Sequence, residues 1–424
     1  MSFTNPKYLN ILRLLRNERR SLDELIHQQN IALQKLIKHA YDTVKFYRRL
    51  FDDCGLYPDD IKCVEDISKI PIIDKQILQR NSFDDLVSEE YKMKRLIPIT
   101  TTGSTGIMLK FFIDHSYDQF RKAQFLRPYI TNGRGLLDKT VIFSAPKPTA
   151  KKWFQRFGVM TDNKVYFNSG KDKQVKIIQK IKPDILQGCA SVLNLLALEI
   201  LDEHISIPKP RIVFTDSEVL TTNMRKNIEE AFSAEVIDIF GTYETDNIAY
   251  ECHSHNGYHI AMDCVIMEFI RKGKKAEPFE ESEIVVTVLN NFAMPFIRYN
   301  LHDAGAYSSR TCSCGRTFPL LMNIYGRSDN YLTTPDGKKL SFALLGAYWH
   351  SLTNFVYEFQ VIQEDKNTFS ILVVPSNSYS DECRKIILTE INKYFPLAKI
   401  NIKLVPAIER KGPGKFMTFI SKVN

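Results

Sequence analysis

The sequence lacks any long apolar run. Its hydrophobic residues make up 44% of the chain but never form the stretch of roughly 20 residues that a membrane-spanning helix requires. The start, Met1 to Lys7, has no apolar core of the kind that a secretory signal peptide carries. These two absences lead us to expect a cytoplasmic protein with no transmembrane segment.

Cysteine is scarce, with eight residues in a chain of 424. Small secreted proteins that depend on disulfides use far more, so a disulfide scaffold is excluded and reduced thiols are expected. Internal repeats and low-complexity segments are absent, and the length exceeds that of a typical single domain. We therefore expect one large domain and a smaller one.

The sequence also has no block of one charge sign. It holds 57 Lys and Arg residues against 49 Asp and Glu residues, a formal net charge of +8, and basic residues are scattered among acids along its length. This scatter argues against a nucleic-acid partner. The basic excess suits a cleft that handles anionic ligands, and it suits equally a solvated surface that happens to be basic.

Short apolar strands alternate with amphipathic helical segments through most of the chain. The predicted strands are Leu96 to Thr100, Thr140 to Ser144, Ile185 to Gln187, Arg211 to Thr215 and Glu235 to Phe240. The predicted helices are Ser21 to Cys54, Lys173 to Ile181, Leu193 to His204 and Thr222 to Phe232. This alternation predicts an α/β fold with mostly parallel sheets flanked by helices. Ligands in such folds lie beyond the carboxyl ends of the strands, and the loops after Ile99 and Phe240 are expected at such positions.

The pattern changes beyond about residue 330. Phe369 to Val374 and Ile400 to Val405 are strand-like, and they flank a predicted helix from Ser380 to Tyr394. This end of the chain predicts a small, compact α+β domain.

The segment Thr100-Thr-Thr-Gly-Ser-Thr-Gly106 collects hydroxyl groups and two glycines behind a predicted strand. Backbone N–H and hydroxyl donors in such a loop suit the wrapping of phosphates, and glycine permits close approach. It is not a P-loop, because no Gly-Lys-Ser/Thr closes it. Without its context, a surface turn is the commoner interpretation.

Further motifs follow in a fixed order: Phe240-Gly-Thr-Tyr-Glu244, Arg298-Tyr-Asn-Leu-His-Asp303, Gly326-Arg-Ser-Asp329 and Gly414-Lys-Phe416. With the serine- and threonine-rich loop, they resemble the adenylate-forming enzyme superfamily. Two stretches near the amino terminus, His39-Ala-Tyr41 and Glu65 to Lys75, resemble its phenylacetate-CoA ligase branch, which includes relatives from capsular polysaccharide gene sets. The resemblance covers nearly the whole chain.

The resemblance implies a nucleotide site and a role for each motif. The ATP phosphates would be held by Thr101, Thr102, Gly103, Ser104, Thr105 and Gly106. Glu244 would bind Mg2+ on these phosphates as a catalytic residue, and its neighbours Gly241, Thr242 and Tyr243 would line the nucleotide. A single carboxylate is enough for Mg2+ when phosphate and water supply the other ligands. Ile107 departs from the lysine usual in the family loop, so that contact with the outer phosphates is absent or supplied elsewhere.

Asp303 would accept the ribose hydroxyls, and Arg327 would also contact the nucleotide. The resemblance divides the chain into residues 1–328, an adenylation domain, and residues 329–424, a mobile domain. Rotation of the mobile domain would deliver Lys415 as the electrostatic catalyst of adenylation. Lys411 is the rival, but the Gly-Lys-Phe context favours Lys415.

Cysteines and histidines form a second set. It consists of Cys252, His253, His255, His259 and the run Cys312-Ser-Cys-Gly-Arg316. A Cys-x-Cys-Gly knuckle with one distant Cys and one His would complete a tetrahedral Cys3His zinc site, and all-protein ligands would make it structural. Some members of the resembled branch carry a matching pattern. We assign the ligands as Cys252, His259, Cys312 and Cys314, with His255 and His253 open as alternatives to His259; unliganded surface residues are the simpler alternative.

The acyl pocket is the least defined part. Its candidates are Phe143 to Pro146, Gln187 to Ser191, Asp216 to Glu218 and Tyr243 to Asn247, because they sit at strand ends or beside Glu244. The polar residues Asp246 and Asn247 suggest an acid other than a plain aryl acetate.

The whole pattern predicts a ligase that uses ATP and Mg2+ to convert a small carboxylic acid into an acyl-adenylate. A thiol, coenzyme A, would then take the acyl group. A carrier protein, an amine or a sugar hydroxyl is the alternative acceptor. A non-catalytic component of a polysaccharide assembly system is the alternative from another class. The acid, its pathway and a homodimeric state stay open.

Overall fold

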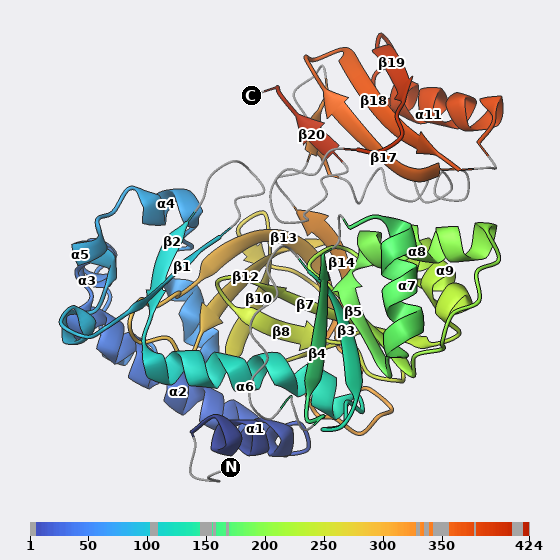
Figure 1. Ribbon diagram of the computed structural model, residues 1–424. Coiled ribbons are helices and arrows are strands. Elements are labelled where there is room, and N and C mark those ends of the chain that lie inside the picture. The colour runs from blue at the N-terminus through green and yellow to red at the C-terminus, as the bar shows by residue number, and fades with distance from the viewer. Residues whose placement is uncertain are drawn as a thin grey trace. The chain divides into compact units, whose positions relative to one another are not determined.

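The structure is a computed structural model of the whole chain (Figure 1). It describes residues 6–101, 109–144, 155, 158–166, 169–327, 331–334, 339–341, 356–376, 379–408 and 419–423. The chain divides into two compact units: residues 1–133 with 239–324, and residues 134–238 with 325–424. The predicted domain boundary at residue 328 lies outside the described residues and stays a prediction.

The first unit begins with a group of helices. Its longer helices are α1 (Pro6–Asn17), α2 (Leu22–Thr43), α3 (Lys45–Asp53) and α6 (His115–Thr131). Its shorter ones are η1 (Pro58–Asp60), η2 (Val64–Lys69), α4 (Lys75–Gln79), α5 (Phe83–Leu86) and η3 (Glu89–Tyr91). Ser21 begins α2, and its side chain accepts a hydrogen bond from the Glu24 N–H at 3.3 Å. The helix predicted from Ser21 to Cys54 is two helices, because Val44 between them is extended (φ −117°, ψ 109°).

The strands of the first unit pair in antiparallel fashion. The strands β1 (Ile97–Thr100) and β2 (Lys110–Ile113) form a separate hairpin. The larger sheet holds β8 (Asp246–Tyr250), β9 (Tyr258–Ile260), β10 (Val265–Arg271), β11 (Lys274–Lys275), β12 (Ser282–Val288), β13 (Tyr299–Ser308) and the first residues of β14 (Leu320–Arg327). Its apolar core includes Val265, Ile284, Val286 and Phe296 together with Leu36 and Tyr47 from the helices.

The second unit contains the parallel sheet that the sequence predicts. Its strands are β3 (Lys139–Ser144), β4 (Thr161–Tyr166), β5 (Ile185–Cys189), β6 (Ile212–Asp216) and β7 (Glu235–Thr242), in the order β4-β3-β5-β6-β7. The helices between them are α7 (Lys171–Ile181), α8 (Ala190–Asp202) and α9 (Thr222–Phe232). Residues 235–238 of β7 belong to this unit and pair with β6, whereas residues 239–242 belong to the first unit and pair there with β8.

The carboxyl-terminal part of the second unit is a small α+β structure. It contains β15 (Tyr331–Thr333), β16 (Lys339–Ser341), β17 (Val356–Gln363), β18 (Thr368–Pro375), α11 (Asp381–Tyr394), β19 (Lys399–Leu404) and β20 (Phe419–Ser421). Four of its strands form a mixed sheet in the order β19-β18-β17-β20. Phe369, Ile371 and Val373 of β18 pack with Ile387 of α11 and with Phe395.

The α/β fold and the small terminal domain are confirmed, but parallel pairing is less general than expected. Among the described residues, parallel pairing is found from β3 to β7 and in the terminal structure, where β18, α11 and β19 form a parallel unit and β17 pairs in parallel with β20. The strands from β8 to β13 follow one another after short loops. Such connections leave room only for antiparallel neighbours, since a parallel crossover needs a dozen or more residues.

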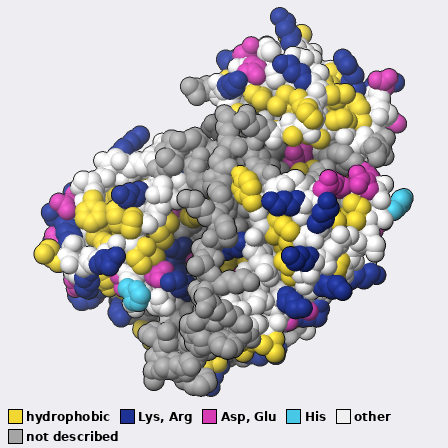
Figure 2. Space-filling view, viewed as in Figure 1, with side chains coloured by type: hydrophobic (Ala, Val, Ile, Leu, Met, Phe, Trp, Pro, Cys, Tyr) yellow, Lys and Arg dark blue, Asp and Glu magenta, His cyan; other side chains and the backbone are white. Residues whose placement is uncertain are grey.

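The described surface and helices can be compared with the charge pattern and the apolar content of the sequence. Figure 2 shows Lys and Arg side chains dispersed among Asp and Glu on the described part of the visible face, rather than gathered into one block. Among the described helices, none is both long and apolar enough to cross a bilayer.

A buried ion pair holds the first unit together at α6. Arg127 is fully buried, and its Nη1 donates to both carboxylate oxygens of Asp263 at 2.9 Å. Asn17 Nδ2 donates to the same carboxylate at 2.9 Å. The guanidinium also lies 5.7 Å and 5.4 Å from the ring centres of Tyr250 and Phe318.

We predict that Arg127→Met destabilises the protein by about 3–5 kcal/mol, because the Asp263 carboxylate would stay buried without its cation. The exposed pair of Arg211 with Asp138 is the matched control, and Arg211→Met should change the free energy of unfolding by less than about 1 kcal/mol. Urea denaturation of both variants measures the difference. Equal, small losses would contradict the assigned role of Arg127.

Candidate nucleotide site and metal centre

The motif that carries Glu244 forms the turn between β7 and β8. The Thr242 N–H donates to Thr245 Oγ1 at 3.3 Å, and the two threonine hydroxyls lie 3.1 Å apart. Asp246, the residue that begins β8, has a positive φ of 61°. A non-glycine residue in this region is strained, and such strain is found often at functional sites.

Gly241 is required by the close approach of two backbones in this turn. The register of β7 and β8 shifts between Phe240 and Gly241. A Cβ atom on Gly241 would lie 2.1 Å from the carbonyl oxygen of Asp246, a distance that no side chain tolerates. The glycine of the motif is therefore explained by packing within the turn.

Glu244 is buried to 9% exposure beside strand β13. Tyr299 Oη donates to its Oε1 at 3.3 Å. Tyr299 begins β13, the strand that also carries Asp303. Two of the motifs found in the sequence are thus in direct contact.

Asp303 lies in an irregular part of β13. Between Val285 and Glu283 of β12, the pairing skips from Asn300 to Ala304, so that three residues of β13 face one residue of β12. Within this bulge His302 has a positive φ of 56°, and its N–H donates to Asn300 Oδ1 at 2.8 Å. Bulges often lie next to active sites, where they change the direction of a side chain. The Asp303 side chain in this bulge is 9% exposed.

Arg298, which begins the same motif, is a structural residue. Its guanidinium donates to Glu268 Oε1 from Nη2 at 2.8 Å and to Oε2 from Nε at 3.0 Å. Its Nη1 donates to the carbonyls of Ser68 and Ile70. Arg298 thus joins the proline-containing segment after η2 to the sheet.

The same segment leads to the phosphate loop. Ile73 and Tyr299 form an isolated parallel bridge, and Lys75 begins α4 two residues later. Lys75 Nζ donates to Thr101 Oγ1 at 3.2 Å. Thr101 and Leu109 also close the loop, since the N–H of each donates to an oxygen of the other at 2.9 Å.

The loop after Ile99 was expected at the carboxyl end of a parallel strand, and this expectation is wrong. The loop joins β1 to β2 in an antiparallel hairpin. A four-residue apolar run indicates a strand but not its partner, and the short distance to Lys110 allows only a hairpin. The loop after Phe240, in contrast, does follow the end of a strand with a parallel neighbour.

Several predicted site residues lie outside the described part of the chain. They are Thr102, Gly103, Ser104, Thr105, Gly106 and Lys415. Arg327 ends β14, and only its backbone is described. Their roles stay predictions.

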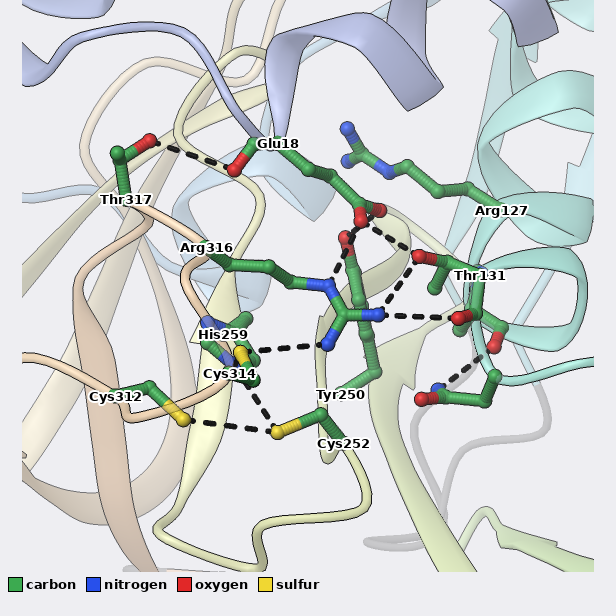
Figure 3. Close-up of polar contacts among 12 residues, drawn as sticks. Glu18, Arg127, Thr131, Tyr250, Cys252, His259, Cys312, Cys314, Arg316 and Thr317 are labelled. Atoms are coloured by element: carbon green, nitrogen blue, oxygen red, sulfur yellow. Dashed lines mark hydrogen bonds and ion pairs between the residues drawn. The ribbon is translucent and has the colours of Figure 1, made fainter.

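The predicted metal ligands meet at one point of the first unit (Figure 3). The ligand atoms of Cys252, His259, Cys312 and Cys314 all lie within 4.8 Å of one another. Cys252 Sγ is 3.6 Å from Cys312 Sγ, and His259 Nε2 is 3.4 Å from Cys252 Sγ and 3.3 Å from Cys314 Sγ. A tetrahedral zinc ion with its usual bond lengths would separate its ligands by about 3.5–3.8 Å. The four side chains therefore have the size of a zinc cage.

The structure selects His259 from the three candidate histidines. His259 is fully buried on β9, and burial with the nearby charge of Arg316 lowers its pKa to about 4. A neutral imidazole is the form that binds metal. His255 instead directs its Nδ1 toward Glu251, 3.7 Å from Oε2.

A buried network adjoins this metal centre, as Figure 3 shows. Arg316 Nη1 donates to Cys314 Sγ at 3.5 Å, and its Nε donates to Glu18 Oε2 at 2.8 Å. Glu18 also accepts from Thr131 Oγ1 at 2.6 Å and from Tyr250 Oη at 2.5 Å. The centre is thereby tied to the α1–α2 connection and to the end of α6.

The network affects the thiols differently. Burial raises the pKa of Cys252 to about 12. Burial also acts on Cys314, but hydrogen bonds from the Arg316 backbone N–H and the Cys312 thiol outweigh it and lower the pKa of Cys314.

Glu18 was missed by sequence reasoning, because a single acid between two helices has no pattern.

Asp246 and Asn247, which the sequence suggested for the acyl pocket, both contact α6, and their role toward the acid stays a prediction. Asp246 Oδ2 accepts from Arg121 Nε at 3.1 Å, and Asn247 Nδ2 donates to the Phe125 carbonyl at 3.1 Å. Both side chains are therefore engaged by α6. In the second unit, Gln187 Nε2 donates to Asp216 Oδ2 at 3.2 Å at the carboxyl ends of β5 and β6.

The small terminal domain matches a family model. Residues 332–422 match the model described as the CapK C-terminal domain.

The chain is also similar to curated proteins over most of its length. It is 28% identical over 336 residues to phenylacetate-coenzyme A ligase of Pseudomonas putida, which covers 74% of this chain and 73% of the relative. It is 24% identical over 388 residues to protein CapK of Staphylococcus aureus, which covers 88% of this chain and 83% of that protein.

Solved structures share the fold. The structure of 2-hydroxyisobutyryl-CoA ligase with 2-HIB-AMP, in its postadenylation state, aligns with a TM-score of 0.77 and 18% identity over 96% of this chain and 91% of that one. The anthranilate CoA ligase AuaEII with anthranoyl-AMP aligns with a TM-score of 0.54 and 14% identity, over 82% of this chain and 73% of that one.

The fold is thus the one seen in adenylate-forming CoA ligases. In sequence the chain is related to phenylacetate-coenzyme A ligases and to protein CapK, which confirms the resemblance inferred from the motifs.

We predict that Gly241→Ala destabilises the protein by about 1–3 kcal/mol or more, because the added methyl group must displace the Asp246 backbone. Tyr243→Ala, in the same turn but at a half-exposed side chain, should change stability by less than about 0.5 kcal/mol. Urea denaturation compares the two, and a stable Gly241→Ala protein would refute the packing argument.

Proposed function

We propose that this protein is an AMP-forming acid–thiol ligase. A carboxylate oxygen of the acid would attack the α-phosphorus of ATP, form the acyl-adenylate and release pyrophosphate. The thiol of coenzyme A would then attack the acyl carbon and release AMP. The observation that carries the proposal is a series of contacts that joins three nucleotide motifs in one unit. Thr101 contacts Lys75, Ile73 of the same segment bridges to Tyr299, and Tyr299 contacts Glu244.

The residues of the first unit suit a bound Mg-ATP. Glu244 offers a carboxylate at low exposure, and Mg2+ needs only one or two carboxylates besides phosphate oxygens and water. The ammonium group of Lys75 lies at the base of the proposed phosphate loop. Lys75 would supply the cation that the family loop usually has at the position of Ile107. Asp303 and Arg327 would hold the ribose and nucleotide.

Lys415 would act in the first half-reaction. Negative charge develops on the α-phosphate and on the attacked oxygen, and a cation delivered to that point lowers the barrier. The C-terminal domain from residue 329 would deliver it by rotation and then admit coenzyme A.

The acyl acceptor has one specific alternative. The relation to protein CapK over 88% of this chain raises the prospect of a role in polysaccharide biosynthesis, with a sugar, an amine or a carrier protein as the acceptor. The relatives named as coenzyme A ligases favour the thiol. A non-catalytic scaffold is disfavoured, because the strained turn at Glu244 would have no purpose in it.

The metal centre is proposed to hold a structural Zn2+ ion. Four protein ligands leave no open position for chemistry, and the ion would fix the Cys312–Cys314 knuckle to β9 and to Cys252. The buried guanidinium of Arg316 suits the negative charge that three thiolates and one Zn2+ leave.

We predict that Lys415→Ala lowers ATP–pyrophosphate exchange by about 100-fold or more, since electrostatic groups of this kind contribute 10²–10³ in rate. Lys411→Ala is the control from the same segment and should retain exchange within about threefold. Circular dichroism checks that both variants fold. Undiminished exchange in Lys415→Ala would remove its assigned role.

A second prediction concerns the metal. The wild type should contain about one zinc per chain, and Cys312→Ser should lose most of it, because a hydroxyl is a poor zinc ligand. Cys54→Ser, at an exposed cysteine, is the control and should keep the metal. Elemental analysis of the purified proteins measures both, and a metal-free wild type would end the zinc hypothesis.

A further inference from the structure

Helix α6 reaches the turn that carries Glu244 with two polar side chains. Arg121 Nη2 donates to the Tyr243 carbonyl at 3.1 Å, and its Nε donates to Asp246 Oδ2 at the same distance. Gln124 Nε2 donates to the carbonyls of Thr245 at 2.8 Å and Asn247 at 3.0 Å. Side chains of α6 therefore hold the residues on both sides of Glu244, in addition to the contacts within the β7–β8 turn.

These contacts hold a backbone that is unfavourable without them. Asp246 has φ of 61°, and the close approach at Gly241 leaves no space for the turn to relax in that direction. Gln124 is only 2% exposed, so its hydrogen bonds to the turn are made away from water. Burial raises the pKa of Asp246, and the charge of Arg121 opposes that shift and favours the ionised carboxylate.

A fixed turn matters because of what Glu244 is proposed to do. A carboxylate that binds Mg2+ must meet a near-octahedral geometry with distances of about 2.0–2.1 Å. Supporting side chains set such a ligand more accurately than a loop alone can. Neither Arg121 nor Gln124 directs a hydrogen bond to Glu244 itself, so both act through the backbone.

We propose that Arg121 and Gln124 are positioning residues that fix Glu244 for magnesium-dependent ATP binding, an inference that rests on the proposed function. Their role is to hold the backbone from Tyr243 to Asn247, and they touch neither metal nor nucleotide. Such supporting residues change metal affinity by about 10–100-fold in other metal sites.

The test measures ATP binding by calorimetry with full-length protein, once with Mg2+ and once with EDTA. Arg121→Met and Gln124→Leu should each weaken binding in Mg2+ by about tenfold and leave binding in EDTA unchanged. Arg121→Lys keeps the charge opposite Asp246 and should recover part of the loss. Lys122→Met is the matched control, because Lys122 lies next to Arg121 on α6 and pairs with Asp118 of the same helix rather than with the turn.

Hydrogen exchange of the amides from 243 to 247 provides the second readout. It should speed up in Arg121→Met and Gln124→Leu and not in Lys122→Met. Unchanged exchange, or an equal loss of ATP binding with Mg2+ and with EDTA, would overturn the positioning role. If the wild type bound ATP no more tightly with Mg2+ than with EDTA, the proposed magnesium role of Glu244 would fail, and the positioning role would fail with it. In that case, faster hydrogen exchange in the two variants would show only that α6 supports the turn structurally.

Discussion

The first unit depends on one polar face of helix α6. Arg121, Gln124, Arg127 and Thr131 follow one another at intervals of three or four residues, so they lie on the same side of the helix. Each forms a charged or hydrogen-bonded contact with a segment distant in the sequence. A helix that packed through apolar residues alone could slide or rotate at small cost, whereas these directional contacts fix its position.

This polar face spans the two places where chemistry is proposed. Its first half holds the β7–β8 turn with Glu244, and its last residue, Thr131, donates to Glu18 beside the metal centre. Strand β8 runs between the same two places, from Asp246 to Tyr250, two residues before Cys252. In Figure 1, α6 crosses in front of β8, and their residues are in contact. The nucleotide turn and the metal centre therefore share a helix and a strand as their support.

Burial explains why these charges come in matched sets. A lone carboxylate in the interior is costly, and Asp263 and Glu18 each have an arginine and further donors. Arg316 serves the Glu18 carboxylate and Cys314 Sγ together.

Sequence reasoning succeeded where a residue pattern depends on local geometry. Strands β3, β5, β6 and β7 and the helices between them were predicted closely, and α9 was predicted from Thr222 to Phe232 as observed. Strand β4 (Thr161–Tyr166) was missed. The four predicted metal ligands lie together in space, and the Cys-x-Cys-Gly pattern was the signal that pointed to them. Their binding of an ion stays a prediction. The antiparallel strands were missed, since β10 and β12 are apolar on both faces and show no alternation.

Contacts between distant segments could not be read in the same way. Glu18 to Arg316, Arg127 to Asp263 and Arg121 to Asp246 each join residues more than a hundred positions apart. Nothing in the local sequence distinguishes these arginines from the many on the surface. The contacts of Asp246 and Asn247 with α6 could likewise not be read from the sequence, where their polarity suggested only a polar acid.

Formation of an acyl-adenylate is the central claim, and isotope transfer tests it most directly. Purified protein is supplied with ATP, Mg2+, coenzyme A and a panel of carboxylic acids labelled with 18O in both carboxylate oxygens, and the nucleotide product is examined by mass spectrometry. Attack by the acid on the α-phosphorus predicts AMP that carries one 18O from the acid that serves as substrate. ADP as the product, unlabelled AMP, or no turnover with any acid of the panel would contradict it.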